Sequence, residues 1–495
     1  MNKQSIYTLN ECTISLDIGT THIKAIAYTL DGKLAASATS LIPSNLEGIQ
    51  SAAKIYEDSL GVLSRVFGSL FKSGIQPLCI SISAAMHSIL PVTKTGEALA
   101  PAMLWSNNTG QEIAISLRSS DLGSKIYAQT GTPIHPMNPF IKLAWMKTND
   151  VTLFKSTSKF ISIKEYVYYH LCGYFEIDYS IASSSGLFYS KELCWSKLAL
   201  DFAGLSDIQL GKPVSPYQQQ NLLPSLCQKW KLPRSFPIIA GASDGCLASL
   251  GAAPLIEGNI SLSMGTSGAL RSALLKFKTD EFGRTFTYLL DENHFIMGGP
   301  SNNAGNVYSW LNNLLTNHKP NRSSIDLLNN EASKIEPGAN GLSFIPYLFG
   351  ERAPLWDANA SSSFEGLRNI HSTSHFARAV MEGIIFNMRF IFEIISEKVQ
   401  VNEIHAGGGL SRSKLWIETI SSIFNHSIHL QKEKEDSAAG AAIIALASLG
   451  KIPSITDQNI FYQQSELIMP NSLHAMLYEP LYESFKKRIK TVIDP

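Results

Sequence analysis

One eight-residue pattern occurs twice in this chain of 495 residues, almost half its length apart. Residues 14–21 read ISLDIGTT, and residues 260–267 read ISLSMGTS. In both copies a run that favours β-strand meets a glycine and two hydroxyl residues, which predicts a strand that breaks into a turn with backbone N–H groups open to an anion. The repeat indicates two related halves that each open with such a turn, and a chance likeness between two short apolar runs is the alternative.

Strand and helix patterns alternate around the two copies. Residues 78–83 and 237–240 read as strands, and residues 52–71 read as a helix. Residues 376–395 indicate a largely buried helix, and the small apolar residues 438–449 suit a helix packed closely against a neighbour. This alternation is typical of an α/β fold.

The position of the second copy predicts how the chain divides. We expect two domains, residues 1–252 and residues 253–495, joined by a short crossover near residues 252–258 that contains Pro and Gly. No low-complexity linker separates them.

Charge and cysteine content exclude several classes of function. Lys+Arg and Asp+Glu are both 41, so there is no excess of cations for nucleic acid or for anionic lipid. Apolar runs are broken by charge well short of the ~20 residues that span a bilayer. The six cysteines are scattered and form no C-x-x-C pair, which favours a protein of the reducing cytoplasm over one built on a disulfide framework.

The first copy of the repeat has the groups that a phosphate clamp needs. Gly19 lets the backbone approach a ligand, Thr20 and Thr21 add hydroxyl donors, and Lys24 is a further cation. Asp17 can hold Mg²⁺ directly or through water. The alternative is an ordinary β-hairpin turn with no ligand.

The second copy supplies Gly265, Thr266 and Ser267 in the same arrangement. Two such turns facing each other suit a triphosphate held between two domains. The chain has no G-x-x-x-x-G-K-[ST] loop, and no G-x-G-x-x-G follows a strand, so P-loop and Rossmann nucleotide sites are disfavoured.

Two further loops follow predicted strands. Asp244 stands among small residues directly after residues 237–240, where it is a candidate general base for a phosphoryl acceptor hydroxyl. A helix cap is the alternative for this aspartate. Gly407, Gly408 and Gly409 follow a strand around Ile404, where a nucleotide can lie against bare backbone; a flexible loop is the alternative.

These residues, in this order, resemble the FGGY family of carbohydrate kinases, which belong to the superfamily of actin and hexokinase. Residues 137–146 and 362–382 are similar to the two long signatures of the family, and the resemblance runs from about residue 12 to residue 449. The runs 84–88, 178–183 and 350–357 look most like gluconate kinases, and xylulokinases come next.

The resemblance implies a fold, a mechanism and a site. The fold is α/β, with two actin/hexokinase-like (ribonuclease H-like) domains and an active-site cleft between them. ATP and Mg²⁺ are the implied cofactors, and the acceptor is a small sugar or sugar acid. By resemblance, Asp17 serves the metal, Asp244 is the base, Thr20, Thr21, Gly265 and Thr266 hold phosphates, Gly407, Gly408 and Gly409 lie against the adenosine, and Met86 and His87 line the sugar pocket.

The expected reaction converts D-gluconate to 6-phospho-D-gluconate, with a ketose or polyol kinase as the alternative. A carboxylate substrate calls for a cation or several N–H donors, and His87, Lys142 and Lys164 are the candidates. A cytoplasmic enzyme is expected, without nucleic-acid or membrane partners, and a homodimer is left open.

Three departures from the family pattern motivate a rival from another class, a non-catalytic protein that binds ATP or sugar. Asn107 and Thr109 replace an acidic and a basic residue of a Trp-x-Asp-x-Arg motif. The family usually has Ala-Arg-Gly where this chain has Ala360, Ser361 and Ser362. Ser421 and Ser422 replace an Ala-Asp pair. The presence of both Asp17 and Asp244 argues against loss of catalysis.

Overall fold

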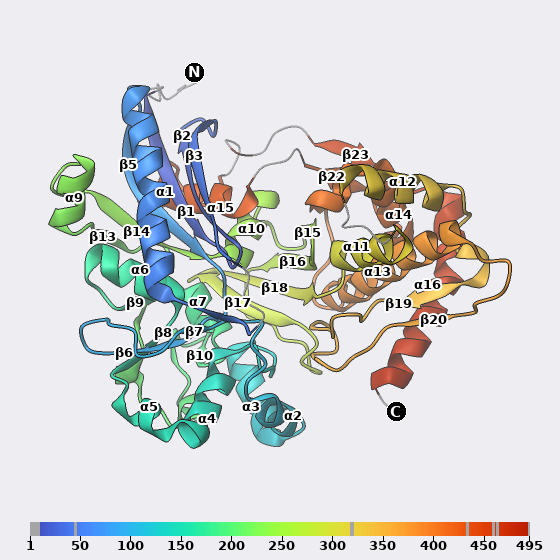
Figure 1. Ribbon diagram of the computed structural model, residues 1–495, viewed down its shortest axis with the longest axis horizontal. Coiled ribbons are helices and arrows are strands. Elements are labelled where there is room, and N and C mark those ends of the chain that lie inside the picture. The colour runs from blue at the N-terminus through green and yellow to red at the C-terminus, as the bar shows by residue number, and fades with distance from the viewer. Residues whose placement is uncertain are drawn as a thin grey trace.

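The computed structural model describes residues 10–43, 47–316, 321–431, 435–457, 461 and 465–493. Two β-sheets organise the chain, one in each half (Figure 1). The first has the order β13-β14-β5-β1-β2-β3, with β1 Glu11–Ile18, β2 His22–Thr29, β3 Leu34–Leu41, β5 Gln76–Ala84, β13 Gln219–Asn221 and β14 Pro237–Ser243. The second has the order β17-β18-β16-β15-β21-β22-β23, with β15 Ile260–Met264, β16 Gly268–Leu274, β17 Phe286–Asp291, β18 His294–Ser301, β21 Ile404–Gly407, β22 Ile428–Leu430 and β23 Glu466–Ile468.

The two sheets share one strand plan. Each copy of the repeated pattern forms a strand and the start of an antiparallel hairpin, β1 with β2 and β15 with β16. Two parallel strands then extend each sheet, β5 and β14 in the first and β21 and β22 in the second. An antiparallel edge strand completes each sheet on that side, β13 or β23. The prediction of two related halves is therefore confirmed.

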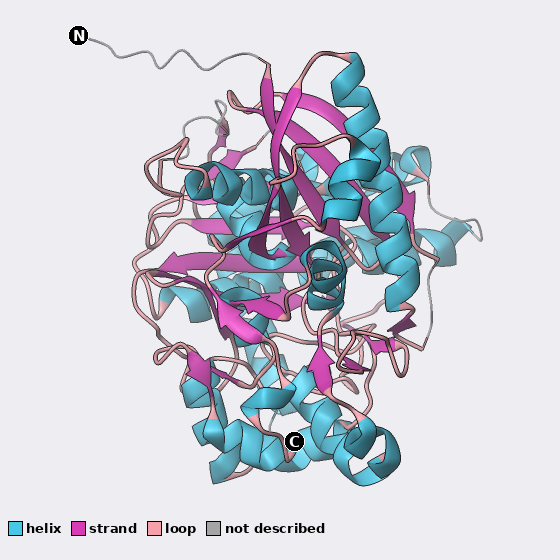
Figure 2. Cartoon of the chain, turned by 90° about the vertical axis from the view of Figure 1, so that its left-hand side faces the viewer, coloured by secondary structure: helices cyan, strands magenta, loops and turns pink. Residues whose placement is uncertain are grey.

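Helices cover the outer faces of the sheets. In the first half, α1 (Ala52–Lys72) starts at Ser51, whose hydroxyl accepts a hydrogen bond from the Lys54 N–H, and it lies along β2 and β3 beside α6 (Ile163–Cys172). Its buried residues recur at helical spacing, which is why this segment packs as a helix. Figure 2 shows long helices crossing the strands of this sheet.

Two short helices join the halves. Helix α10 (Asp244–Ala252) and helix α15 (Asp436–Ser448) pack against each other, and their shared core includes Ile239 from the first sheet and Ile296 from the second. A side chain at Gly440 would lie 2.1 Å from the Leu247 carbonyl oxygen, so only glycine allows this approach. The close packing predicted for residues 438–449 is confirmed, although this helix also packs on β1 and β5 of the first half.

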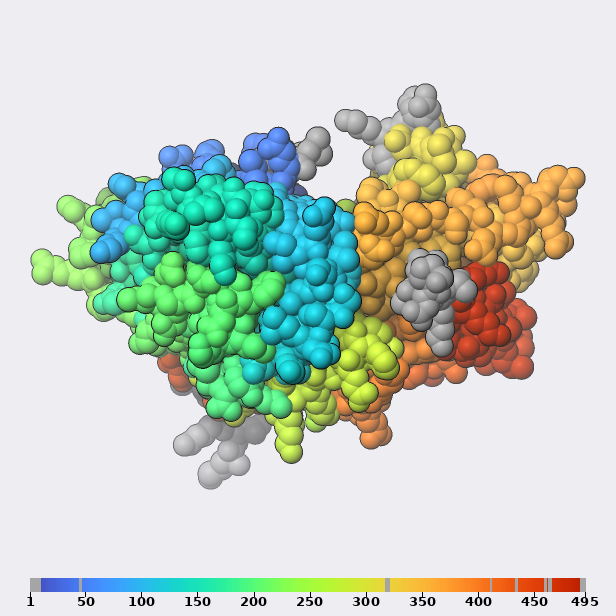
Figure 3. Space-filling model, turned by 90° about the horizontal axis from the view of Figure 1, so that it is seen from below, coloured from blue at the N-terminus to red at the C-terminus, as the bar shows by residue number. Residues whose placement is uncertain are grey.

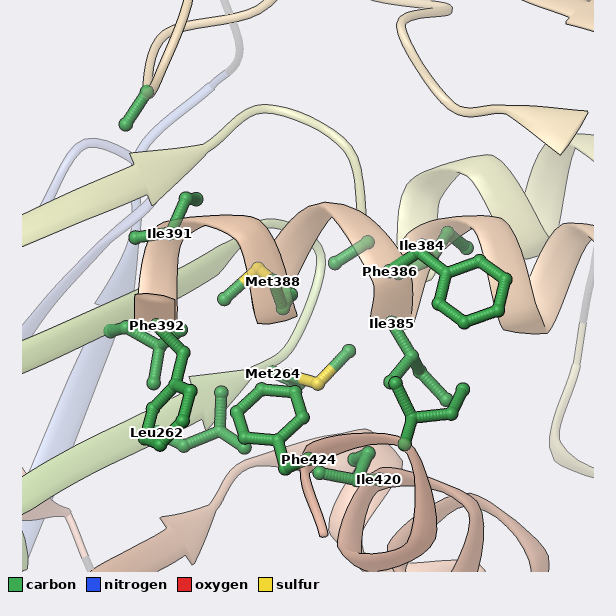
Figure 4. Packing of buried hydrophobic residues seen from close by; sticks show 14 of the residues in the cluster. Leu262, Met264, Ile384, Ile385, Phe386, Met388, Ile391, Phe392, Ile420 and Phe424 are labelled. Atoms are coloured by element: carbon green, nitrogen blue, oxygen red, sulfur yellow. The ribbon is translucent and has the colours of Figure 1, made fainter. Parts of the chain in front are cut away.

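The core of the second half is built on helix α13 (Thr373–Ser396), which confirms the buried helix predicted over residues 376–395. Figure 4 shows Met264, the last residue of β15, between Met388 and Ile385 of α13 and Phe424 of α14 (Lys414–Phe424). Because Met264 is buried in this core, the turn that follows it starts from a fixed position. Helix α16 (Ser472–Ile493) packs against α13 and α14.

An additional lobe lies between β5 and β14 in sequence and carries most of the small helices. Its helices besides α6 are α2 Gln111–Arg118, α3 Asp121–Thr130, α4 Pro139–Asn149, α5 Val151–Ser156, α7 Tyr179–Ser184, α8 Lys197–Ala203 and α9 Pro224–Trp230. The second half adds α11 Gly305–Thr316 and α12 Arg322–Ser333. Figure 3 shows the two halves side by side, with an indentation between them.

The remaining expectations about the chain can be compared with this fold. The strands predicted at residues 78–83 and 237–240 are β5 and β14, and the helix predicted at residues 52–71 is α1. Helix α10 ends at Ala252 and β15 begins at Ile260, and the division after residue 252 stays a prediction. All six cysteines are free. No helix in the described ranges is both long and apolar enough to cross a membrane.

Candidate active site

Two carboxylates meet at one edge of the first sheet. Strands β1, β5 and β14 are parallel, and Asp17 and Ala242 both pair with Ser83 of the central strand β5. Asp17 therefore stands at the end of β1, and Asp244 comes two residues after Ala242 at the end of β14. In parallel sheets ligands bind outside the carboxyl ends of the strands, so this edge is the expected place for a site.

The Asp17 carboxylate is held from both sides. Its Oδ1 accepts a hydrogen bond of 2.6 Å from the Ser83 hydroxyl, and its Oδ2 accepts one of 3.0 Å from the Ser437 hydroxyl at the start of α15. Burial raises the pKa of Asp17, against the lowering effect of these two hydrogen bonds and of the Lys24 charge. These contacts hold the Asp17 carboxylate in one orientation, and a cation bound beside it would favour its ionised form.

Asp244 is the first residue of α10, and its neighbour Ser243 is the helix cap. The Ser243 hydroxyl accepts from the Cys246 N–H, so the alternative in which Asp244 caps the helix is wrong. Burial raises the pKa of Asp244 to about 6, and the Asp17 charge adds to this shift. An aspartate with a pKa near 6 is still ionised at neutral pH and is a stronger base than an ordinary one.

The two repeated turns differ in the space around their glycines. The Gly19 N–H donates to the His22 carbonyl at 3.0 Å, and a Cβ at Gly19 would lie 2.9 Å from that oxygen. The Gly265 N–H donates to the Ser267 carbonyl at 3.0 Å, but a Cβ at Gly265 would meet nothing within 4 Å. The first glycine is required by the turn itself, whereas the second leaves open space beside the backbone.

The hydroxyls predicted to bind phosphate are available in these turns. Among the described residues, the hydroxyls of Thr20, Thr266 and Ser267 form no hydrogen bond within the protein, and Thr266 and Ser267 are exposed. The Thr21 hydroxyl lies 3.0 Å from His22 Nδ1. Lys24 lies opposite Asp17 in the hairpin, but its ammonium is 2.7 Å from Glu435, so its contact with a nucleotide stays a prediction.

The triple glycine lies beside the second turn. Ser263 on β15 pairs with Gly407 at the end of the parallel strand β21. Gly408 has a φ of 90°, and a Cβ there would lie 2.7 Å from the Met264 carbonyl oxygen, so this backbone approach requires glycine. Nothing within 4 Å surrounds a Cβ position at Gly409. The structure thus brings Gly407, Gly408 and Gly409 together with the Gly265 turn.

His87 and Met86 follow the central strand β5 and border the first turn. Met86 lines a small cavity of about 10 Å³ together with Gly19 and Thr20. His87 is buried, and its Nδ1 lies 2.9 Å from the Ser184 carbonyl oxygen. Burial, together with the Lys142 and Arg352 charges, lowers the pKa of His87 to about 3. A neutral His87 that donates from Nδ1 keeps Nε2 as an acceptor, which suits a sugar hydroxyl and not a carboxylate.

The two lysines considered for a substrate carboxylate are engaged elsewhere. Lys142 is fully buried, and its ammonium donates to the carbonyls of Pro136 and Met137, both at 2.7 Å. Lys164 forms a buried ion pair of 2.6 Å with Asp178. The structure therefore supports neither lysine as a ligand of the substrate carboxylate, and both have structural roles.

Sequence analysis missed two arginines near Asp244. Arg271 on β16 and Arg352, which follows Glu351 in one of the runs that resemble the family, both lower the pKa of Asp244 through their charges. The Arg352 guanidinium stacks 5.1 Å from the ring centre of Trp105. No local motif marks Arg271, because its place beside Asp244 depends on the packing of β16 against α10.

The residues that depart from the family pattern have local structural roles. The Asn107 side chain donates to the Glu47 carbonyl at 2.9 Å and accepts from the Thr109 N–H at 3.1 Å, so it holds its own loop together. Inside α14, the Ser421 hydroxyl donates to the His426 carbonyl and that of Ser422 to the Glu418 carbonyl. Nothing in the structure explains Ser361 or Ser362.

Comparison with known protein families covers most of the chain. The N-terminal domain of the FGGY family of carbohydrate kinases matches residues 12–251, and the C-terminal domain of the same family matches residues 260–449.

Known relatives and solved structures point the same way. The gluconokinase of Bacillus subtilis is 34% identical over 452 residues, which cover 89% of this chain and 88% of the relative. The crystal structure of gluconate kinase from Lactobacillus acidophilus superimposes with a TM-score of 0.92 at 30% identity, covering 98% of each chain. A ligand-bound xylulose kinase structure from Lactobacillus acidophilus has the same TM-score and identity, and it covers 98% of this chain and 99% of that one.

Proposed function

The chain belongs to the FGGY family of carbohydrate kinases, and on this premise we propose that it transfers the γ-phosphoryl group of ATP to D-gluconate, giving 6-phospho-D-gluconate. It has the two-domain actin/hexokinase-like fold of that family. The observation that carries the proposal is Asp244, a partly buried aspartate with a pKa of about 6 at the carboxyl end of β14, next to a second carboxylate, Asp17.

In the proposed mechanism, Asp244 removes the proton from the terminal hydroxyl of the sugar as that oxygen attacks phosphorus. The bond to the leaving ADP oxygen breaks as the new P–O bond forms. The backbone and hydroxyls of Gly265, Thr266 and Thr20 would orient the phosphates. Closure of the two domains would exclude water from the reacting groups.

Asp17 fits a Mg²⁺ ion that accompanies the nucleotide. Mg²⁺ prefers oxygen ligands and is usually held by one or two carboxylates, with phosphates and water completing its shell. The hydrogen bonds from Ser83 and Ser437 orient the Asp17 carboxylate. A cation bound there would neutralise negative charge on the phosphates during transfer.

A ketose kinase is the second candidate, because the xylulose kinase structure fits this fold as well as the gluconate kinase structure does. The greater sequence identity to the Bacillus gluconokinase, and the arginine charges near Asp244, favour an acidic acceptor. The cytoplasmic location expected from the six unpaired cysteines stays a prediction, as does a homodimer.

The test is ADP release by the purified protein with Mg-ATP and a panel of D-gluconate, D-xylulose and a polyol. We expect the highest kcat/KM with D-gluconate. A higher value with D-xylulose or the polyol contradicts the substrate assignment. No ADP release with any sugar favours the non-catalytic alternative.

A further inference from the structure

Two guanidinium groups converge on the sugar side of Asp244 from the second half of the chain. The charges of Arg271 and Arg352 both act on Asp244, and the charge of Arg271 also acts on Arg352. A Cβ at Gly245, next to Asp244, would lie 3.5 Å from Nε of Arg271. Two like charges are thus held near one another at the edge of the site.

Neither guanidinium forms an ion pair in the described part of the chain, although the charge of Asp244 acts on both at longer range. In the ranges that the structure describes, no carboxylate oxygen lies within 4.0 Å of a guanidinium nitrogen of Arg271 or Arg352, although Glu351 Oε1 accepts a hydrogen bond from the Arg352 backbone N–H at 2.8 Å. Other buried arginines of this chain are paired; Arg378, for example, lies 2.7 Å from Glu382. Holding two partly desolvated cations together is costly, and an anion that is not in direct contact with them offsets only part of that cost, so their arrangement points to a negatively charged ligand.

Part of their hydrogen-bonding capacity is also unused, since among the described residues the Arg352 side chain donates only from Nε and, at 3.4 Å, from Nη2 to the Ser301 carbonyl. The Arg271 Nε is buried and has no partner, and its Nη1 reaches only the Ser263 hydroxyl, at 3.5 Å. Arg352 donates from Nε to the Asn302 side chain at 2.7 Å, which orients its guanidinium without neutralising it. The Tyr288 side chain is 1% exposed, and its hydroxyl likewise has no partner.

These donors share one neighbourhood on the sugar side of the site. The charges of Arg271 and Arg352 both act on the Tyr288 hydroxyl, whose ring lies edge-on to His87 at 5.9 Å. Arg352 also stacks on Trp105, the first residue of the Trp-x-Asp-x-Arg position at which this chain departs from the family pattern. The described phosphate-turn hydroxyls of Thr20, Thr266 and Ser267 form no bond with either arginine.

We propose that Arg271, Arg352 and the Tyr288 hydroxyl bind the carboxylate of the acceptor and make the enzyme selective for an aldonic acid over a neutral ketose or polyol. The inference rests on the proposed kinase function. In D-gluconate the carboxylate is at the opposite end of the carbon chain from the reacting hydroxyl. Because neither arginine forms an ion pair with Asp244 in the described residues, the guanidiniums can bind the carboxylate while Asp244 binds the terminal hydroxyl.

The test compares D-gluconate with D-glucitol, which has CH₂OH in place of the carboxylate and the same remaining chain. Arg271→Gln removes one charge, and Tyr288→Phe removes only a hydroxyl while keeping the ring stacked on Phe286. Arg65→Gln, on the exposed side of α1, is the matched control. KM and kcat are measured for each sugar, together with KM for ATP.

A hydrogen bond to a charged group contributes about 1.5–3 kcal/mol, so Arg271→Gln should raise KM for gluconate roughly 10- to 100-fold. The kcat at saturating gluconate and the KM for ATP should stay within about threefold of wild type, because a contact made equally in ground and transition states affects KM alone. Tyr288→Phe should shift KM in the same direction by a smaller factor. The ratio of kcat/KM for gluconate to that for glucitol should fall in both variants.

Four outcomes would overturn the inference. An equal loss for both sugars would show a structural role, and a raised KM for ATP with an unchanged KM for gluconate would assign the arginines to phosphate. An unchanged gluconate KM in both variants would exclude the subsite while leaving the kinase function intact. Wild-type protein that prefers glucitol to gluconate would contradict both the proposed function and the subsite.

Discussion

The two halves of this chain share an antiparallel hairpin extended by two parallel strands, but they have different residues at the strand ends. The end of β1 carries Asp17, and the corresponding place in β15 is Ser263. The parallel strand β5 leads into Met86 and His87, whereas its counterpart β21 leads into three glycines. At the ends of these two pairs of strands, the first half thus offers side chains to a ligand, and the second half offers the backbone of three glycines.

The charges divide between the halves as well. Both carboxylates of the site, Asp17 and Asp244, come from the first half, and both unpaired guanidiniums, Arg271 and Arg352, come from the second. The same turn motif, which occurs once in each half, therefore has different charged neighbours in the two halves. The arrangement of the strands sets where each loop lies, and the residue at the end of each strand decides what the loop can bind.

The largest effect is expected when the first half loses its base. Asp244→Asn keeps the shape of the side chain but removes the proton acceptor, so kcat should fall ~10²–10⁴-fold. ADP release measures the rate, and calorimetry with Mg-ATP should show that nucleotide binding is retained. Asp201→Asn, at an exposed carboxylate, is the control and should keep the wild-type rate. A near-normal rate in Asp244→Asn would refute the base assignment.

The paired glycines sharpen the comparison of the two turns. Gly265→Val should weaken ATP binding about tenfold or more, because a side chain in the open space would block hydrogen bonds from the backbone to a charged phosphate. Its Tm should stay near that of wild type. Gly19→Ala should instead lower Tm, because its Cβ would press on the His22 carbonyl oxygen. Equal nucleotide affinity in wild type and Gly265→Val, measured by calorimetry, would remove the second turn from the site.

The raised pKa of Asp244 predicts opposite pH trends in rate and stability. The kcat/KM for the sugar at saturating Mg-ATP should fall as the pH drops below about 6, where the base is protonated. An acid whose pKa rises on folding is protonated more readily in the folded chain, so its ionisation costs stability as pH rises from about 4 to about 6. The difference between the Tm of Asp244→Asn and that of wild type should therefore increase in favour of the variant across this pH window. At higher pH the difference should keep its increased value. A constant Tm difference from pH 4 to 8 would contradict the shift.

Much of this arrangement could be predicted from the sequence, because its signals are local. The repeated pattern predicted both hairpin turns, and the small residues around Asp244 marked the end of β14. The role of Lys142 could not be predicted in the same way, because it depends on the burial of the side chain and on the two carbonyl oxygens that its ammonium contacts. Arg271 lies beside Asp244 only because β16 packs against α10. This contact joins segments that are distant in the sequence, so residue spacing does not predict it.

The smallest predicted effect concerns helix α15, which begins beside Asp17 and the triple glycine. Ser437 at the start of α15 donates to Asp17, and Asp436 Oδ2 lies 3.6 Å from a Cβ position at Gly407. Ser437→Ala removes one of two hydrogen bonds to the Asp17 carboxylate, which contributes about 0.5–1.5 kcal/mol, so KM for Mg-ATP should rise no more than about tenfold. Ser448→Ala, at the far end of the same helix, is the control. An effect as large as that of Asp244→Asn would mean that Ser437 contacts the reacting groups.

The proton-coupled phosphorus NMR spectrum of the product tests most directly whether this chain is a gluconate kinase. Wild-type protein incubated with Mg-ATP and D-gluconate should give ADP and one phosphomonoester. Its phosphorus signal should be split by the two protons of a CH₂ group, as expected for phosphate on the terminal hydroxyl. A spectrum with no phosphorylated gluconate, recorded from a preparation that phosphorylates D-xylulose under the same conditions, would contradict the assignment.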